Sequence, residues 1–327
     1  MEMKDKVLAF LKEQEEYRSG EEISQKIGVT RAAIWKAIKK LQADGYEIES
    51  STKKGYKLLT TPNVITPSEI KHNLCTEILG QDVFFKEEMD STNNQAKVLA
   101  REGAKEGMLV IAERQSQGKG RLGRNWESPA GEGIWMSLIL RPYILPRYAS
   151  QLTLIAGLAM CEVIQEITGL DARIKWPNDI VVNGKKVCGI LTEMSAEMEG
   201  INYIILGIGV NVNMVSFPEE LPYASSLVRE GKKEYSRRTI IKGFLEKFEA
   251  DYKAYKKHPD LTAIMERYEK NCITLNRKVK LLMNNEEIIA KATGISKEGE
   301  LLVILEDGTS KTIASGEVSV RGLYDYI

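Results

Sequence analysis

The chain has 327 residues, enough for two or three domains at roughly 100–200 residues per domain. Apolar residues make up 43% of it, so it can bury a substantial core and wholesale disorder is excluded. Basic and acidic residues number 46 each, so the net charge is zero and an anionic partner requires a local basic patch. Because only two histidines occur, we expect neither a multi-histidine metal site nor a His-based catalytic triad.

The cysteines and the apolar runs predict the compartment of the protein. Cys75, Cys161, Cys188 and Cys272 are far apart and form no Cys-x-x-Cys pair, which predicts buried thiols in a reducing environment. No run approaches the ~18–20 uninterrupted apolar residues of a membrane helix. The first residues also lack the pattern of a signal peptide. We therefore expect a cytoplasmic protein with no membrane partner.

Residues 1–62 predict a winged helix-turn-helix domain. Ser19 and Glu22 fit a capping box that opens a short helix. After a glycine-containing turn, Thr30 can cap a second helix whose apolar residues recur at helical spacing. Two strands of a β-ribbon are expected next, at residues 46–50 and 55–59. Two helices joined at an angle by such a turn allow the second helix to enter the DNA major groove.

Charge is unevenly distributed in this region. Residues 28–57 carry seven basic and three acidic side chains, whereas residues 2–22 carry four basic and seven acidic ones. A basic second helix and wing are suited to contact the phosphate backbone of DNA. The same charges are also compatible with a solvated helix or with a winged helix that docks on a protein. We expect DNA binding. The candidate contacts are Thr30, Arg31, Ala32, Trp35, Lys36, Lys39, Lys40, Lys53 and Lys54.

Turn residues at 60–63 and 66–67 end this first region, and residues 67–271 mix strands and helices. Asn183-Gly184, between two predicted strands, is typical of a tight hairpin. Short turns between successive strands predict an antiparallel sheet and an α+β fold. Strands are expected at 108–113, 134–140, 172–176, 180–183, 186–193 and 203–213, and helices after 90–94 and at 149–168, 236–256 and 261–271.

Residues 118–124 (Gly-Lys-Gly-Arg-Leu-Gly-Arg) combine three glycines with three cations. They match the pattern G-x-G-x-x-G, but a dinucleotide fingerprint opens a helix and residues 125–131 cannot form one. No Gly-Lys pair precedes Ser or Thr, so a Walker A sequence is absent. The loop backbone with Lys119, Arg121 and Arg124 can instead hold an anion, although a solvated surface loop also explains the pattern.

Further polar groups stand at predicted strand ends and turns. They are residues 90–94 (Asp-Ser-Thr-Asn-Asn), Gln115, residues 175–179 (Lys-Trp-Pro-Asn-Asp), Lys186 and residues 207–211 (Gly-Ile-Gly-Val-Asn). Each has an ordinary structural explanation when taken singly: N-capping, a turn around a packed Trp, an exposed edge lysine or a bulge. Two glycines within a strand can also mark a close approach of the backbone to a ligand.

The order of these motifs resembles that of the biotin–protein ligases. The motifs are Ser-Thr-Asn at 91–93, Gln115, Gly-x-Gly-Arg-x-Gly-Arg-x-Trp at 118–126, the motif at 175–179, Lys-Val-Cys-Gly-Ile-Leu at 186–191 and Gly-x-Gly-x-Asn at 207–211. With the winged helix-turn-helix ahead of them, nearly the whole chain resembles the bifunctional biotin operon repressors and biotin–[acetyl-CoA-carboxylase] ligases of bacteria. The Arg-Arg-x-Ser-Gly-Gly-Gly motif of the related lipoate ligases is absent.

The resemblance implies a two-step reaction in which biotin and ATP form biotinyl-5′-AMP and a lysine of a biotin carboxyl carrier protein takes the biotin. It implies Mg²⁺ with the ATP, operator DNA of biotin genes as a partner and a homodimer promoted by biotinyl-5′-AMP. The implied domains are the winged helix-turn-helix (1–62), an antiparallel-sheet catalytic domain resembling class II aminoacyl-tRNA synthetases (67–271) and a C-terminal SH3-like small barrel (272–327). Short strands expected at 277–282, 287–295, 301–306 and 311–314 suit such a barrel.

Motif positions carry the family's roles onto this chain. The resemblance implies that Lys186, Arg121 and Asp179 are catalytic, with Lys186 bridging the reacting carboxylate and the α-phosphate. The implied biotin-binding residues are Ser91, Thr92, Asn93, Gln115, Lys119, Gly120, Arg121, Lys186 and Gly189. The implied nucleotide-binding residues are Trp126, Lys175, Asn178, Asn211 and Arg321. Lys119 departs from the Arg of many members, which keeps the charge but loses bidentate donation.

The residue types fit this chemistry. The carboxylate of biotin, with a pKa near ~4.3 like that of Glu, is ionised at pH 7 and needs no general base. The obstacle is repulsion from the triphosphate, roughly 4 kcal/mol for two unit charges 4 Å apart at an effective dielectric of 20. Fixed cations such as Lys186 and Arg121 can offset it.

Two other functions remain open at this point. One is a ligase whose winged helix does not bind DNA, and the basic face at Lys36 and Lys39 argues against it. The other is a transcription factor with an inactive sensor domain, and the intact Lys186, Arg121 and residues 175–179 argue against that.

Overall fold

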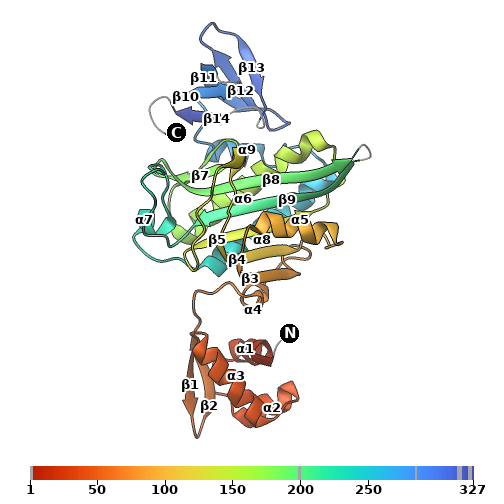
Figure 1. Cartoon of the computed structure of the whole chain (residues 1–327), viewed down its shortest axis with the longest axis vertical. Coiled ribbons are helices and arrows are strands. Elements are labelled where there is room, and N and C mark those ends of the chain that lie inside the picture. The colour runs from red at the N-terminus through yellow and green to blue at the C-terminus, as the bar shows by residue number, and fades with distance from the viewer. Residues whose placement is uncertain (1–2, 198–199, 284–285, 315–318, 323–325) are drawn as a thin grey trace. The chain divides into compact units, whose positions relative to one another are not determined.

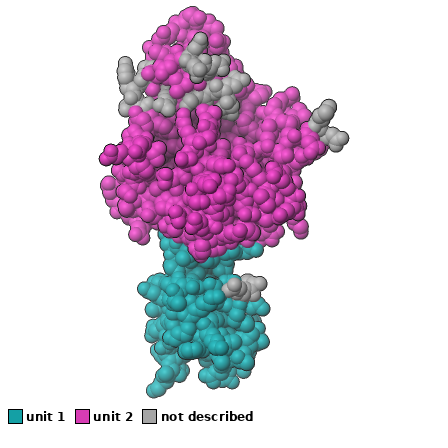
Figure 2. Space-filling model, in the orientation of Figure 1, with its two compact units in different colours: residues 1–73 teal, residues 74–327 magenta. Residues whose placement is uncertain are grey.

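The computed structural model describes residues 3–197, 200–283, 286–314, 319–322 and 326–327. The chain divides into two compact units, residues 1–73 and residues 74–327, and each is described by itself (Figure 2). Across the described residues, no helix combines the length and the hydropathy that a bilayer span requires.

Unit 1 consists of three helices, a two-stranded ribbon and a short fourth helix (Figure 1). Its elements are α1 (Met3–Lys12), α2 (Gly20–Ile27), α3 (Arg31–Ala43), β1 (Glu47–Ser51), β2 (Gly55–Thr60) and α4 (Pro67–Lys71). Ser19 and Thr30 cap α2 and α3, each accepting a hydrogen bond from a backbone N–H of the first turn. Gly28 ends α2 with φ 76°, a conformation that glycine adopts without steric cost. The predicted helix-turn-helix is confirmed.

The core of unit 1 is apolar except at one place. Its nearly inaccessible side chains are Val7, Leu8, Leu11, Ile23, Ile34, Ile38 and Leu41. The buried Glu69 of α4 accepts a hydrogen bond from the Tyr46 hydroxyl (2.7 Å) and pairs with the ammonium of Lys12 (2.5 Å). Because a buried charge that loses its partner is costly, this pair holds α4 against the helices of unit 1.

Unit 2 is built on a seven-stranded sheet with the order β3-β4-β5-β9-β8-β7-β6. The strands are β3 (Val83–Met89), β4 (Leu109–Gln115), β5 (Gly133–Leu140), β6 (Ala172–Lys175), β7 (Asp179–Val182), β8 (Lys185–Glu197) and β9 (Gly200–Asn211). Every neighbouring pair is antiparallel except β3 and β4. The antiparallel prediction is wrong for that pair because α5 (Thr92–Arg101) crosses over between the two strands, which aligns them in parallel.

Helices cover both faces of this sheet (Figure 1). On one face, Asn93 of α5 fills the space above Gly207 of β9. On the other face, Thr153 of α6 (Ala149–Thr168) is hydrogen-bonded to Thr192 of β8 at 2.7 Å. Leu191 is paired with Gly207, so its neighbour Thr192 points to the opposite face. The helices α7 (Leu227–Gly231), α8 (Arg237–Lys257) and α9 (Met265–Asn271) follow, and α8 and α9 both pack against α6.

A second sheet follows in unit 2. Its order is β13-β12-β11-β10-β14, all antiparallel, with β10 (Lys278–Met283), β11 (Glu286–Ile295), β12 (Leu301–Leu305), β13 (Ser310–Ile313) and β14 (Ser319–Gly322). The indole N–H of Trp176 donates to the carbonyl of Gly299, just before β12, at 3.1 Å. The Trp of the 175–179 turn is 1% exposed and lies beside the loop that precedes β12.

The four cysteines are free thiols. Cys161, Cys188 and Cys272 are buried, as predicted. Cys75 is exposed, and the prediction of burial is wrong there because this residue lies in the segment between α4 and β3.

Candidate active site and nucleic-acid interface

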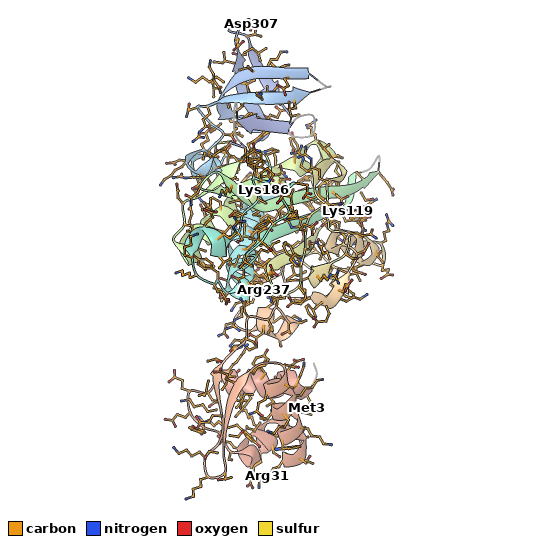
Figure 3. The ribbon with its side chains drawn as sticks, turned by 60° about the vertical axis from the view of Figure 1, so that its left-hand side comes forward. Met3, Arg31, Lys119, Lys186, Arg237 and Asp307 are labelled. Atoms are coloured by element: carbon orange, nitrogen blue, oxygen red, sulfur yellow. The ribbon has the colours of Figure 1, made fainter. Side chains whose placement is uncertain are left out.

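A cavity of about 710 Å³ lies in unit 2 on the sheet face that α5 covers. It is lined by residues that the sequence assigned to biotin, nucleotide or chemistry: Ser91, Thr92, Asn93, Gln115, Lys119, Gly120, Arg121, Trp126, Lys175, Asn178, Asp179, Lys186, Gly189 and Asn211. Figure 3 shows Lys119 and Lys186 in this part of unit 2. Arg321 lies in β14, but its side chain is outside the described part of the structure.

A carboxylate and two lysines meet at one edge of the cavity. Asp179 opens β7, its register partner Lys175 ends β6, and Lys186 lies in β8. The Lys186 ammonium is 2.5 Å from Oδ1 of Asp179, and the Tyr326 hydroxyl donates to Oδ2. Burial by itself raises the pKa of Asp179, but Lys186, Lys175 and the two donated hydrogen bonds bring that pKa below its ordinary value. Asp179 is therefore ionised at neutral pH.

The backbone of Lys186 is hydrogen-bonded to the segment between β9 and α7. Its N–H donates to the carbonyl of Tyr223 (2.7 Å), and its own carbonyl accepts from the N–H of Ser225 (2.9 Å). The ammonium also lies 5.1 Å from the centre of the Trp126 ring. The lysine is consequently directed into the cavity from a fixed strand, which is not the position of an exposed edge lysine.

The loop of residues 118–126 is folded. The N–H of Gly120 donates to the carbonyl of Arg124 (2.7 Å), and the N–H of Trp126 donates to that of Gly118 (2.9 Å). The guanidinium of Arg121 donates to Oδ1 of Asn178 at 3.1 Å. Burial lowers the pKa of Arg121 below its ordinary value, and the nearby Asp179 opposes that shift.

The remaining cations of this loop are exposed, and Lys119 donates to Oδ1 of Asn94 at 3.1 Å. The loop therefore surrounds one side of the cavity with positive charge.

Two glycines of the strands make room for the indole of Trp126. A Cβ atom at Gly189 would lie 2.8 Å from that ring, and one at Gly209 would lie 2.6 Å from it. The pairing of β8 with β9 runs through Gly189 and Gly209 without a register shift, so these glycines mark a close approach and not a bulge between the two strands. The indole N–H is buried without a hydrogen-bond partner among the described residues, which is a cost that a ligand acceptor could remove.

A hydroxyl and amide cluster lines the cavity beside α5 and β4, and strands β5 and β9 lie between β4 and β8. Ser91 occupies the N-cap position of α5, yet its hydroxyl accepts no cap hydrogen bond, so plain N-capping does not explain it. The side-chain oxygen of Gln115 accepts from the N–H (2.7 Å) and the hydroxyl (3.0 Å) of Thr92, and its amide donates to Ser128 (2.9 Å). These polar groups are fixed in a mostly buried setting, as recognition of a small polar ring requires.

Asn93 has protein partners for both ends of its amide. Its nitrogen donates to Glu193 (2.8 Å), and its oxygen accepts from Ser137 (2.6 Å). Lys97 pairs with the other oxygen of Glu193 at 2.6 Å. A Cβ at Gly207 would lie 2.1 Å from the Asn93 oxygen, so this glycine is what admits the amide. The geometry makes Asn93 a residue that fixes the start of α5.

The sequence did not identify two parts of the cavity wall, namely the segment between β9 and α7 and the residue Tyr326. Phe217, Leu221 and Tyr223 come from the irregular segment between β9 and α7, which the Asn211 side chain anchors by donating to the carbonyl of Ser225 (3.0 Å). The second part is Tyr326. Aromatic residues in a stretch with neither helical nor strand periodicity were the available indication. Within the described residues, no group of three or more His, Cys, Asp or Glu side chains is placed to hold a metal ion.

In unit 1, α3 has two distinct faces. Ile34, Ala37, Ile38 and Leu41 are buried. The predicted DNA contacts Thr30, Arg31, Ala32, Trp35, Lys36, Lys39, Lys40, Lys53 and Lys54 are all exposed. Trp35 is 53% exposed among these basic side chains. Figure 3 shows Arg31 at the surface of this unit.

Comparison with known proteins places these observations in a family. Residues 85–211 match the Biotin/lipoate A/B protein ligase family, residues 4–57 match an HTH domain, and residues 274–321 match the Biotin protein ligase C terminal domain. The chain is 40% identical over 311 residues to the bifunctional ligase/repressor BirA of Bacillus spizizenii, covering 94% of this chain and 95% of that protein. The chain belongs to the biotin–protein ligase family.

Within the biotin–protein ligases, similarity extends over both units. BirA of Escherichia coli is 32% identical and 94% of each chain is covered. A structure described as a biotin protein ligase from Aquifex aeolicus in complex with biotin and ATP is 32% identical with a TM-score of 0.65. That match covers 99% of the Aquifex chain but 74% of this one.

Proposed function

We propose that the protein is an ATP-dependent biotin–protein ligase that also represses transcription of biotin synthesis genes. The observation that carries the ligase function is the cavity of unit 2. Its wall combines the cations Lys186, Arg121 and Lys175, at the side of strands β6 to β8, with the Ser91, Thr92 and Gln115 cluster, at the side of strands β3 and β4. A small polar ring with a carboxylate tail fits such a division between neutral hydrogen-bonding groups and cations.

The proposed reaction has two steps. In the first, a biotin carboxylate oxygen attacks the α-phosphorus of ATP, the bond to the β-phosphate oxygen breaks, and pyrophosphate leaves. In the second, the neutral amine of a carrier-protein lysine attacks the carboxyl carbon of biotinyl-5′-AMP. An amide forms and AMP leaves with the bonding electron pair, while the amine releases a proton.

Each of these two groups of residues has its own task in this proposal. Ser91, Thr92 and Gln115 bind the ureido ring, with Asn93 fixing the helix that carries the first two. Lys186 and Arg121 offset the repulsion between the carboxylate and the phosphates and stabilise the charge that develops on the phosphoryl oxygens. Asp179 holds Lys186 until the substrates arrive. Further biotin contacts are assigned to Lys119, Gly120 and Gly189, and nucleotide contacts to Trp126, Lys175, Asn178, Asn211 and Arg321.

ATP would bring Mg²⁺ on its phosphates, and the ion would neutralise part of their charge. Asp179 is the buried carboxylate of the cavity, but it is engaged by two lysines and a tyrosine. We therefore assign the ion to the nucleotide.

We further assign a winged helix-turn-helix to residues 1–62, a catalytic domain related to class II aminoacyl-tRNA synthetases to residues 67–271, and an SH3-like barrel to residues 272–327. The five-stranded antiparallel sheet supports the last assignment. The partners are a biotin carboxyl carrier protein, operator DNA and a second copy of the chain, all in the cytoplasm. The second candidate function, a ligase without DNA binding, is disfavoured by the exposed basic face of α3.

Two assays test the proposal. Purified protein given biotin and ATP should release pyrophosphate, and addition of a biotin carboxyl carrier domain should yield its biotinylated form. A gel shift on DNA upstream of biotin synthesis genes should depend on biotin plus ATP. Absence of pyrophosphate release would refute the ligase. Absence of a shift beside normal ligation would leave the ligase without a repressor.

A further inference from the structure

Tyr326, the penultimate residue of the chain, lies in the wall of the cavity and contacts three side chains there. Its hydroxyl donates to Oδ2 of Asp179. Its ring lies under the ammonium of Lys175, 3.5 Å from the ring centre, and is stacked on Tyr223 with centroids 5.4 Å apart. No motif of the family resemblance includes this residue.

We propose that Tyr326 is a positioning residue for the adenylation step, acting through Asp179 and Lys175. The inference rests on the proposed ligase function and deepens it. Asp179 has two oxygens and two neighbouring lysines, so the simplest arrangement would be one lysine on each oxygen. Tyr326 works against it, because its hydroxyl donates to Oδ2 while the Lys186 ammonium pairs with Oδ1.

The ring has a separate effect on Lys175. Lys175 is buried, with 6% of its surface exposed. An aromatic face stabilises an ammonium more strongly when the cation is desolvated. The ring therefore keeps a desolvated cation oriented toward the cavity, where ATP can engage it.

A simpler role would be to anchor the end of the chain. Ile327 does contact the hairpin, since a Cβ at Gly184 would lie 3.3 Å from its side chain. The two roles predict different behaviour. An anchor affects all activities together, whereas a positioning residue changes the rate of adenylation and its pH dependence while biotin binding stays the same.

The test uses the full-length protein with Tyr326→Phe, which removes only the hydroxyl, and Tyr326→Ala, which removes the ring. For Tyr326→Phe we expect kcat of pyrophosphate release to fall about 10- to 100-fold, the range for loss of a hydrogen bond to a charged group. Biotin affinity by calorimetry should stay within about twofold of the wild-type value. Tyr326→Ala should in addition raise KM for ATP, because Lys175 loses its support.

The pH profile separates the two roles. The hydroxyl donates to the charged form of Asp179, so its loss raises the pKa of that carboxyl. The acid limb of kcat should therefore move to higher pH in Tyr326→Phe. The other groups that face Asp179 are unchanged by the substitution. They are Lys175 from β6, Lys186 from β8, Arg121 from the loop, and the neutral thiol of Cys188.

Two control variants complete the design. Tyr143→Phe makes the same chemical change at a fully exposed tyrosine, and Ile327→Ala loosens the end of the chain without altering Asp179. Both should retain wild-type kcat and pH profile. A wild-type kcat and acid limb in Tyr326→Phe would overturn the inference, as would parallel losses of kcat, biotin affinity and Tm. Failure of the wild-type protein itself to release pyrophosphate would refute the ligase and this inference together.

Discussion

At the scale of single residues, the cavity shows how differently two nearby cations are held. Lys186 is paired with the ionised Asp179 at 2.5 Å, whereas Arg121 donates to the neutral amide of Asn178 at 3.1 Å. An ammonium on a strand with a flexible stem can move from Asp179 to an incoming carboxylate and phosphate. Lys186 is therefore the cation best placed to follow the developing charge.

We expect Lys186→Ala to retain most biotin binding and to slow biotinyl-5′-AMP formation by at least ~10²-fold, the scale for losing one preorganised donor. The neighbouring Lys185→Ala is the control, because Lys185 is exposed on the same strand. Pyrophosphate release measures the rate, and calorimetry measures biotin affinity. A near-normal rate in Lys186→Ala would remove this lysine from the mechanism.

The sequence predicted most of the cavity wall because the motif residues are chemically distinctive and recur in a fixed order. It could not predict where the Trp126 indole lies, since that depends on Gly189 and Gly209 being brought together by two strands. Tyr326 was missed for the same reason. Its contacts join residues 147 positions apart, and no local pattern reports them.

At the scale of elements, prediction succeeded where the local pattern was strong. The largely apolar stretch at 149–168 is α6, and Gly169 with φ 73° ends it in the conformation that glycine favours. The strand β3 was not predicted because its first three residues are only partly buried and the next three, residues 86–88, are charged and exposed. Its parallel pairing with β4 is set by the path of α5, which a sequence pattern does not encode.

The start of α5 depends on a neighbouring strand. Glu193 of β8 binds both Asn93 and Lys97. Burial by itself raises the pKa of Glu193, but these contacts bring it below its ordinary value. We expect Glu193→Gln to weaken biotin binding by about tenfold, or ~1.4 kcal/mol, because Ser91 and Thr92 lose their support.

The matched control is Glu197→Gln, since Glu197 is exposed on the same strand and accepts a hydrogen bond from the side chain of Asn202. Calorimetry on both variants decides the matter. Equal biotin affinity in Glu193→Gln and the wild-type protein would mean that α5 is positioned without this carboxylate.

At the scale of the whole molecule, one chain is proposed to carry two activities in separate units. We expect Lys36→Glu with Lys39→Glu to abolish operator binding and leave ligase turnover unchanged, since both residues are exposed on α3 and phosphate contacts dominate DNA affinity. The control places the same charge change at Lys6 and Lys71, which are exposed on α1 and α4. An unchanged gel shift with the α3 substitutions would show that α3 does not bind the operator DNA.

The two activities need a common effector, and we expect this corepressor to be biotinyl-5′-AMP rather than biotin. Backbone hydrogen bonds already fold residues 118–124, but the side chains of Lys119, Leu122 and Arg124 are exposed, and fixing such a side chain costs up to ~2 kcal/mol. Biotin offers one carboxylate to the three cations of this loop, whereas the adenylate adds a phosphate and a base. An ordered loop can provide surface for a partner. A chain of zero net charge gains DNA affinity most readily by pairing two winged helices on two half-sites.

Ligand-driven dimerisation would then couple biotin supply to repression, and unmodified carrier protein would relieve repression by consuming the adenylate. Sedimentation of the protein alone, with biotin, and with a non-hydrolysable biotinyl-5′-AMP analogue tests this, and the analogue should give the largest dimer fraction. Lys186→Ala adds a control, because biotin plus ATP should fail to dimerise it while the analogue succeeds. Equal dimer fractions in all three wild-type samples would exclude the adenylate as corepressor, and so would equal protection of residues 118–124 from protease.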